Sequence, residues 1–330
     1  MALARPSRRT AAAAIALVVA AAAGAAFWWL TGRDDPDRDC AGLRGDDRIR
    51  TVLGAAWRSD LPCGELADGL HHATVGDRPG SHTLEQARAL RSVLSAVASR
   101  ADHRVHPEVR RPLANALADY AADTHAVLTG INNLYTAHDG PGADAWQDDN
   151  GVHVAVEKSQ LTSVLRGLSD DPAAYATLRA ADLHQGALGL AAIGADPSGP
   201  EIEDPLARAA APAGVFDGIA DDVLRDRDGK ARTAWQDAVL SGLAAPVTAV
   251  PAFATDPAGY LTQSWLRQVA AAPDRFTRLH DQAADLLSLW GDATRRDRER
   301  TGIAGLQDRA RTTTDRERAE TVQQFKQSSP

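Results

Sequence analysis

Aromatic side chains are scarce in this chain of 330 residues. They make up 5% of it, although 44% of the residues are hydrophobic. Alanine is the most common apolar residue, and it favours helices that pack closely through small side chains over an aromatic-rich β-sandwich. So large an apolar fraction can bury a substantial core, which excludes global disorder. We therefore expect an all-α fold, as one large domain or two modest ones.

Positive charge is also in short supply. The chain has 36 basic and 44 acidic residues, for a net charge of −8. Three of the basic residues, Arg5, Arg8 and Arg9, stand near the N-terminus without a neighbouring acid, so the rest of the chain is more acidic still. Binding to nucleic acid requires a basic stripe, and no stretch outside the arginine-rich tail provides one. We predict no nucleic-acid partner.

Residues 11–30 lack any charge, and they end in Phe27, Trp28 and Trp29. Such a run is long enough to cross about 30 Å of hydrocarbon as a helix, and tryptophan suits the interface. Arginines precede the run and an acid-rich stretch follows it, so the positive-inside rule places residues 1–10 in the cytoplasm. We expect a single-pass anchor in the lipid of the cell membrane, with the large domain outside the cytoplasm. A cleaved signal peptide, with small residues at 23–26, is the alternative.

Cysteine occurs only twice, at Cys40 and Cys63. Both lie on the predicted oxidising side of the membrane, where a pair is more often a disulfide than two free thiols. We predict a structural disulfide in a membrane-proximal segment, residues 31–80. Closing this loop should stabilise the fold by roughly 3 kcal/mol.

Helical periodicity organises the remainder of the chain. Apolar residues recur at helical spacing across 81–195 and again across 206–293, which predicts two helical subdomains. A stretch rich in proline, glycine and acid, residues 196–205, predicts a linker between them. Pro107 should open one helix that runs to about Gly130. Residues 294–330 are strongly charged, which predicts a solvated helical or disordered tail.

One loop partly matches a calcium site. Gly151, with five residues between it and Glu157, copies the second half of a calcium loop, after the polar residues Asp148, Asp149 and Asn150. Trp146 occupies the position of the first carboxylate, so we favour a plain polar turn and leave calcium open. Alternating valines at 152, 154 and 156 predict a short strand or an extended entry into the next helix. Asp226, Asp228 and Gly229 predict a turn that breaks a helix.

The remaining candidates are paired histidines and paired acids. His71 with His72, and His103 with His106, have no Glu or Cys at zinc spacing, so we interpret them as surface residues. Asp170 with Asp171, and Asp221 with Asp222, are expected to be solvated or to cap helices. No nucleophile elbow, zinc-protease motif or phosphate loop occurs in the sequence. We assign no catalytic, cofactor-binding or metal-binding residue and expect no cofactor.

Three segments, 106–130, 161–193 and 213–238, resemble uncharacterised actinobacterial helical proteins associated with WXG100-like, type VII secretion gene sets. The resemblance rests on apolar patterning together with Asp171, Pro172, Ala174, Tyr175 and Leu178. It implies a helical architecture and a secretion context but no activity. The rarity of lysine, found only at positions 158, 230 and 326, agrees with the GC-rich genomes of that group.

These features predict a non-enzymatic, membrane-anchored module outside the cytoplasm that binds a protein partner of the cell envelope, as an accessory to secretion. The alternative is an envelope hydrolase or transferase whose carboxylates come from distant helices. Two converging acids in a deep cleft would favour the enzyme, whereas an exposed apolar patch would favour the binding module.

Overall fold

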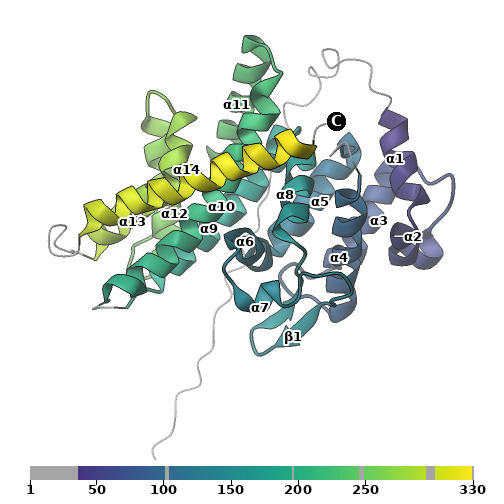
Figure 1. The fold of residues 1–330 in the computed structure, drawn as a ribbon, viewed down its shortest axis with the longest axis horizontal. Coiled ribbons are helices and arrows are strands. Elements are labelled where there is room, and N and C mark those ends of the chain that lie inside the picture. The colour runs from purple at the N-terminus through teal and green to yellow at the C-terminus, as the bar shows by residue number, and fades with distance from the viewer. Residues whose placement is uncertain (1–35, 101–103, 195–196, 245–248, 295–301, 329–330) are drawn as a thin grey trace, which may run out of the picture. The chain divides into compact units, whose positions relative to one another are not determined.

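The computed structural model describes residues 36–100, 104–194, 197–244, 249–294 and 302–328 (Figure 1). These residues form 14 α-helices, two short 3₁₀ helices and one two-stranded hairpin. The predicted all-α class is therefore confirmed. None of the helices in these ranges is both long enough and apolar enough to span a bilayer. The predicted membrane segment, residues 11–30, lies outside the described part of the chain.

The N-terminal helices are joined by a disulfide. The segment contains α1 (Pro36–Gly45), α2 (Asp47–Leu53), η1 (Gly54–Ala56) and α3 (Cys63–Val75). Cys40 on α1 is bonded to Cys63 at the start of α3, with 5.9 Å between the Cα atoms. The predicted disulfide is confirmed. It ties α1 to the helices that follow, because α3 packs on α4 and α5.

Buried apolar faces define the next helices: α4 (Leu84–Ala98), α5 (Pro107–Asp119), α6 (Ala121–Thr129), α8 (Lys158–Leu168) and α9 (Pro172–Ala191). The single helix predicted from Pro107 to Gly130 is instead two helices, α5 and α6, which break at Tyr120. The Tyr120 ring stacks on His82 at 3.6 Å, and its hydroxyl donates to the Thr74 carbonyl at 3.1 Å. These contacts hold Tyr120 against α3 and turn the chain there.

Helix α10 (Gly199–Arg225) begins inside the predicted linker, so residues 199–205 are helical. Ser198 and Glu201 form a capping box at its start, and Ile202 and Leu206 are buried around Pro205. Burial of these side chains outweighs the cost of proline within a helix. The linker prediction was wrong for these residues, because the count of prolines and acids ignored the apolar positions between them.

The second half adds α11 (Gly229–Ala244), α12 (Pro257–Ala271), η2 (Thr277–Asp281) and α13 (Gln282–Ala293). Trp235, Trp265 and Trp290 are among its largest fully buried side chains, at the inward positions that periodicity predicts. Helix α9 packs on α5 and α6 and also on α10, α11 and α12. The two predicted subdomains therefore pack together within one compact unit.

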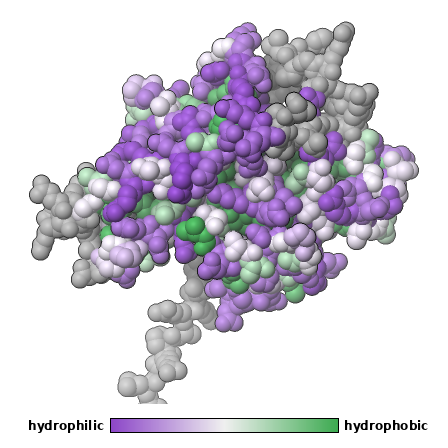
Figure 2. All heavy atoms as spheres, in the orientation of Figure 1, coloured by the Kyte–Doolittle hydropathy of each residue, from purple (hydrophilic) through white to green (hydrophobic). Residues whose placement is uncertain are grey.

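The charged tail forms helix α14 (Ile303–Ser328), which lies along α10 (Figure 1). Its outward face is largely hydrophilic (Figure 2). Its inward stripe is buried and contains Ile303, Leu306, Ala310, Thr314, Glu317, Thr321 and Phe325. The helical alternative is correct, but the helix is packed rather than simply solvated. Gly214 and Gly218 of α10 make this possible, because a Cβ at either position would collide with α14.

Candidate functional site

The segment between α6 and α8, residues 130–157, is mostly non-helical in an otherwise helical protein. We call it the hairpin region. It holds the short helix α7 (Asn133–Thr136) and strands β1 (Trp146–Asp148) and β2 (Gly151–His153). The strands pair in antiparallel register, with Trp146 opposite His153. Irregular segments on a rigid scaffold often carry function, so this region is the first candidate site.

A buried carboxylate holds the hairpin region to the helical core. Asp123 on α6 is 4% exposed. It accepts hydrogen bonds from the Tyr135 hydroxyl at 2.5 Å, from His153 Nδ1 at 2.8 Å and from the Val154 amide at 3.1 Å. Three donors from separate parts of the region therefore converge on one side chain. Burial raises the pKa of the Asp123 carboxyl, and these hydrogen bonds lower it by less.

An arginine holds the region from the other side. Arg91 on α4 donates to the backbone carbonyls of His138 at 2.8 Å, Asp139 at 3.2 Å and Gly140 at 2.8 Å. It also donates to the carbonyl of Ala155. Burial lowers the pKa of Arg91 more than the charges of Asp144 and Asp139 raise it. One guanidinium therefore fixes the backbone on both sides of the hairpin.

His153 lies between two carboxylates. Its Nδ1 contacts Asp123, and its Nε2 contacts Asp148 Oδ1 at 3.1 Å. The Trp146 ring is tilted against His153 at 5.2 Å and stacks on His138 at 4.3 Å. Burial alone would lower the pKa of His153, but the two carboxylates outweigh it and raise the pKa above its ordinary value of 6.5. The imidazole of His153 thus links the hairpin to α6.

This arrangement predicts a pH-dependent contribution to stability. A raised folded pKa means that the stabilisation by His153 is fully present below about pH 6.5 and is lost as the pH rises through the folded value. We expect His153→Gln to lower the free energy of unfolding by about 1–2 kcal/mol at pH 6 and by less at pH 9. Urea denaturation at both pH values measures the difference.

The matched control is His72→Gln, because the His72 side chain is 71% exposed. It should change the stability little at either pH. An equal loss for His153→Gln at pH 6 and pH 9 would show that His153 contributes packing rather than charge.

The predicted polar turn is observed at residues 149–150. Asp148 Oδ1 accepts the amide of Asn150 at 2.7 Å and also contacts His153, and Glu157 is the N-terminal cap residue of α8. Asp148 thus stabilises the hairpin, whereas Glu157 precedes α8 without a side-chain capping hydrogen bond. Of the predicted alternating valines, Val152 lies in β2, and Val154 and Val156 lie in the segment that leads into α8.

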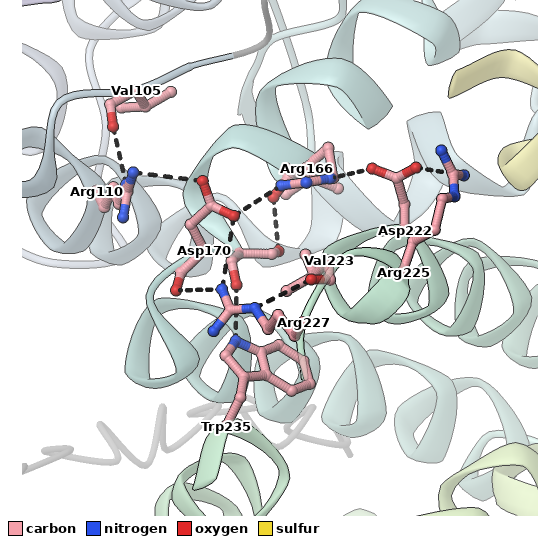
Figure 3. Close-up of polar contacts among 11 residues, drawn as sticks. Val105, Arg110, Arg166, Asp170, Asp222, Val223, Arg225, Arg227 and Trp235 are labelled. Carbon is pink, nitrogen blue, oxygen red and sulfur yellow. Dashed lines mark hydrogen bonds and ion pairs between the residues drawn. The ribbon is translucent and has the colours of Figure 1, made fainter. Parts of the chain in front are cut away.

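A second, partly buried polar cluster joins helix ends (Figure 3). The arginine cluster consists of Arg110, Arg166, Asp170, Asp222, Arg225 and Arg227. Arg166 Nη1 donates to Asp170 at 2.9 Å, and its Nε donates to Asp222. Arg227 donates to the carbonyls of Val223 at 3.0 Å and Asp170 at 3.4 Å.

The arginine cluster stabilises the ends of α8 and α10. Burial lowers the pKa of Arg227, Asp170 raises it, and the neighbouring guanidinium groups of Arg166 and Arg110 lower it further. Arg166 and Arg225 lie in the last turns of α8 and α10, where the macrodipole favours cations. Below the cluster, Trp235 Nε1 donates to the Ser169 carbonyl at 3.0 Å. We assign this cluster a structural role.

The paired acids are engaged rather than solvated. Asp171 caps α9, as predicted, by accepting the amide of Ala173 at 2.8 Å. Asp221 pairs with Arg318 of α14 at 2.6 Å. Asp170 and Asp222 belong to the arginine cluster. The turn predicted at Asp226–Gly229 separates α10 from α11.

The prediction that His106 is a surface residue was wrong. Its side chain is 7% exposed and caps α5. His72 is exposed, His71 is half-buried, and His103 lies outside the described residues. Cys63, His106 and Glu108 hold potential ligand atoms within 4.8 Å of one another. They do not fit a metal, since Cys63 is in the disulfide and His106 Nδ1 accepts the Glu108 amide at 3.2 Å.

The most deeply buried charge pair is Arg179 with Asp217. Their exposed fractions are 0% and 2%. Arg179 Nη1 lies 2.5 Å from Asp217 Oδ1, and the guanidinium also donates to the Leu279 carbonyl and to Gln282. His280 Nδ1 lies 2.7 Å from the other Asp217 oxygen. This network joins α9, α10, η2 and α13.

Asp123, Arg91 and Arg179 were not predicted from the sequence. The sequence pattern around Asp123 and Arg179 did contain an indication that they are buried. Asp123 precedes Thr124 and Val127 on the inward face of its helix, and Arg179 stands four residues after the inward Tyr175. A charge within an apolar stripe indicates a buried ion pair. Arg91 carries no such signal, because its partners are backbone carbonyls.

Comparison of the chain with protein-family models, with curated proteins and with solved structures yields no match.

Proposed function

We propose that this protein is a membrane-anchored helical module outside the cytoplasm that binds a protein partner of the cell envelope. One observation supports this above all: the hairpin region is fixed by Asp123 and Arg91 and carries exposed apolar side chains. Ile131 is 57% exposed and Leu134 is 45% exposed. A rigid segment that presents apolar side chains loses little conformational entropy on binding.

A third exposed apolar residue lies on α9, which runs beside α6. Leu188 on α9 is 43% exposed. Arg111 contacts Asp171, and His125 contacts Asp182, so α5 and α6 run parallel to α9. Ile131 and Leu188 each follow His125 and Asp182 by six residues. Figure 2 shows an apolar spot on a mostly hydrophilic face, near the position of α6 and α7 in Figure 1. We call Ile131 and Leu134 the apolar patch.

The test is crosslinking of the full chain in its native membrane, followed by mass spectrometry. The double variant Ile131→Asp with Leu134→Asp should lose at least ten-fold of the specific crosslinks, because two charges would have to be buried on binding. Ala56→Asp, an exposed alanine on η1, is the control and should keep them.

Crosslinks to secretion-channel or WXG100-like proteins that disappear in the double variant would support an accessory role in secretion. Crosslinks that are unchanged in the double variant would contradict binding through the apolar patch.

The enzyme alternative also has a residue that favours it. Asp285 is 5% exposed, and burial raises its pKa to about 6, although Arg278 at 2.6 Å lowers it. A carboxyl with this pKa suits general acid catalysis. Asp281 contacts the same arginine at 3.4 Å. Hydrolysis of peptidoglycan or peptides by the purified chain, lost in Asp285→Asn, would establish this alternative and contradict the binding module.

A further inference from the structure

A groove beside the hairpin region has the composition of an anion site. It encloses about 430 Å³ between α2, α4 and the loop before β1. We call it the basic groove, and its lining is Arg48, Arg88, Arg91, Ser92, Ser95, Ala143 and Asp144. Four of these residues, 88, 91, 92 and 95, have the spacing of one helix face, so α4 directs them to the same side.

Each arginine of the groove is held in place by known partners. Arg48 donates its Nε and one Nη to Asp46, at 2.9 and 2.6 Å. Arg88 pairs in the same way with Asp144, at 2.9 and 2.7 Å. Arg91 is bound to backbone carbonyls and forms no ion pair with any described carboxylate. The guanidinium groups are therefore oriented before any ligand arrives.

Donors remain available in the groove. Within the described residues, Nη1 of Arg48 and Nη1 of Arg88 form no hydrogen bond, and neither do the hydroxyls of Ser92 and Ser95. The two serines are half-buried and the Arg88 side chain is 54% exposed, so solvent and ligands reach them. The carbonyls that Arg91 binds carry only partial charge, and Asp144 and Asp139 act on it without forming an ion pair, so Arg91 adds positive charge to the groove.

We propose that the basic groove binds a phosphate group. Two guanidinium groups and two hydroxyls offer donors from α2 and α4, and a tetrahedral phosphate accepts from more directions than a planar carboxylate. Asp144 competes with the ligand for Arg88. The source is either a soluble phosphate compound or a phospholipid headgroup, because Arg48 follows the predicted membrane segment closely in sequence. The proposal does not depend on the apolar patch.

Isothermal titration of the full chain in phosphatidylcholine nanodiscs tests the proposal, with inorganic phosphate as the probe at constant ionic strength. Arg88→Gln should weaken binding about ten-fold, since it removes a hydrogen bond between charged groups. Asp144→Asn should tighten binding several-fold, because it releases Arg88. Arg78→Gln makes the same change of charge at an exposed site outside the groove and should leave the affinity unchanged.

The tightening by Asp144→Asn cannot come from misfolding, so it separates binding from structural damage. Three results would overturn the proposal. They are a failure to bind phosphate, an equal effect of Arg78→Gln and Arg88→Gln on the affinity, and binding of acetate as strong as that of phosphate. Repeating the titration in phosphatidylglycerol nanodiscs identifies the source. A weaker apparent affinity there would show that headgroups occupy the groove, and an unchanged affinity would indicate a soluble phosphate compound.

Discussion

Arg179→Met should lower the free energy of unfolding by about 3–5 kcal/mol, because it leaves the carboxylate of Asp217 buried without its main counter-charge. Asp217 is 2% exposed, so water cannot replace the guanidinium. Burial raises the pKa of Asp217, but Arg179 first and then His280 lower it below its ordinary value. The substitution also removes the donors to Gln282 and to the Leu279 carbonyl. Urea denaturation at neutral pH measures the change.

The control makes the same substitution in an exposed pair. Arg58 lies 3.0 Å from Glu65, with side chains 55% and 59% exposed. Exposed ion pairs contribute little, so Arg58→Met should change the stability by about 0.5 kcal/mol or less. Similar losses for Arg179→Met and Arg58→Met would show that the Arg179 network is not buried as described.

Gly218→Leu should separate α14 from α10. A Cβ at Gly218 would lie 2.7 Å from Thr321 Cβ and 2.8 Å from the Arg318 carbonyl oxygen, and the backbone of α14 cannot yield as a flexible side chain would. We expect a loss of about 3 kcal/mol from overpacking. Backbone amides of residues 303–328 should also exchange with solvent much faster, as hydrogen exchange with mass spectrometry would detect.

Gly305→Ala provides the matched control on α14 itself. A Cβ at Gly305 meets no atom within 4 Å, so alanine should preserve the packing and stabilise the helix by about 0.5–1 kcal/mol. Slow exchange across α14 in Gly218→Leu would contradict the close approach of the two helices.

The position of α14 also explains why its composition is so polar. Lys158 contacts the buried Glu317 at 2.6 Å, and Arg318 contacts Asp221. The middle of its buried stripe is Thr314, Glu317 and Thr321. In the middle of α14, close approach at two glycines and specific ion pairs thus take the place of large apolar side chains.

The sequence by itself determined the features that depend on neighbours along the chain. Alanine content and helical periodicity predicted the all-α class, and the cap at Asp171 was predicted and is observed. The disulfide was predictable because the chain has only two cysteines. The helices and the cap follow from the conformational preferences of a short stretch of residues. The disulfide follows from the number of cysteines, which allows one pairing.

Only the tertiary structure decided which charges are buried and what they contact. Asp123 meets donors from up to 31 residues away, and Arg179 meets Gln282 across 103 residues. Arg91 binds carbonyls, which every residue possesses, so no residue type could have indicated its partners. The same holds for α14, since Gly214 and Gly218 have meaning only opposite Thr314 and Thr321. Desolvation and close packing depend on groups that are distant in sequence. The contacts between such groups determined the candidate site.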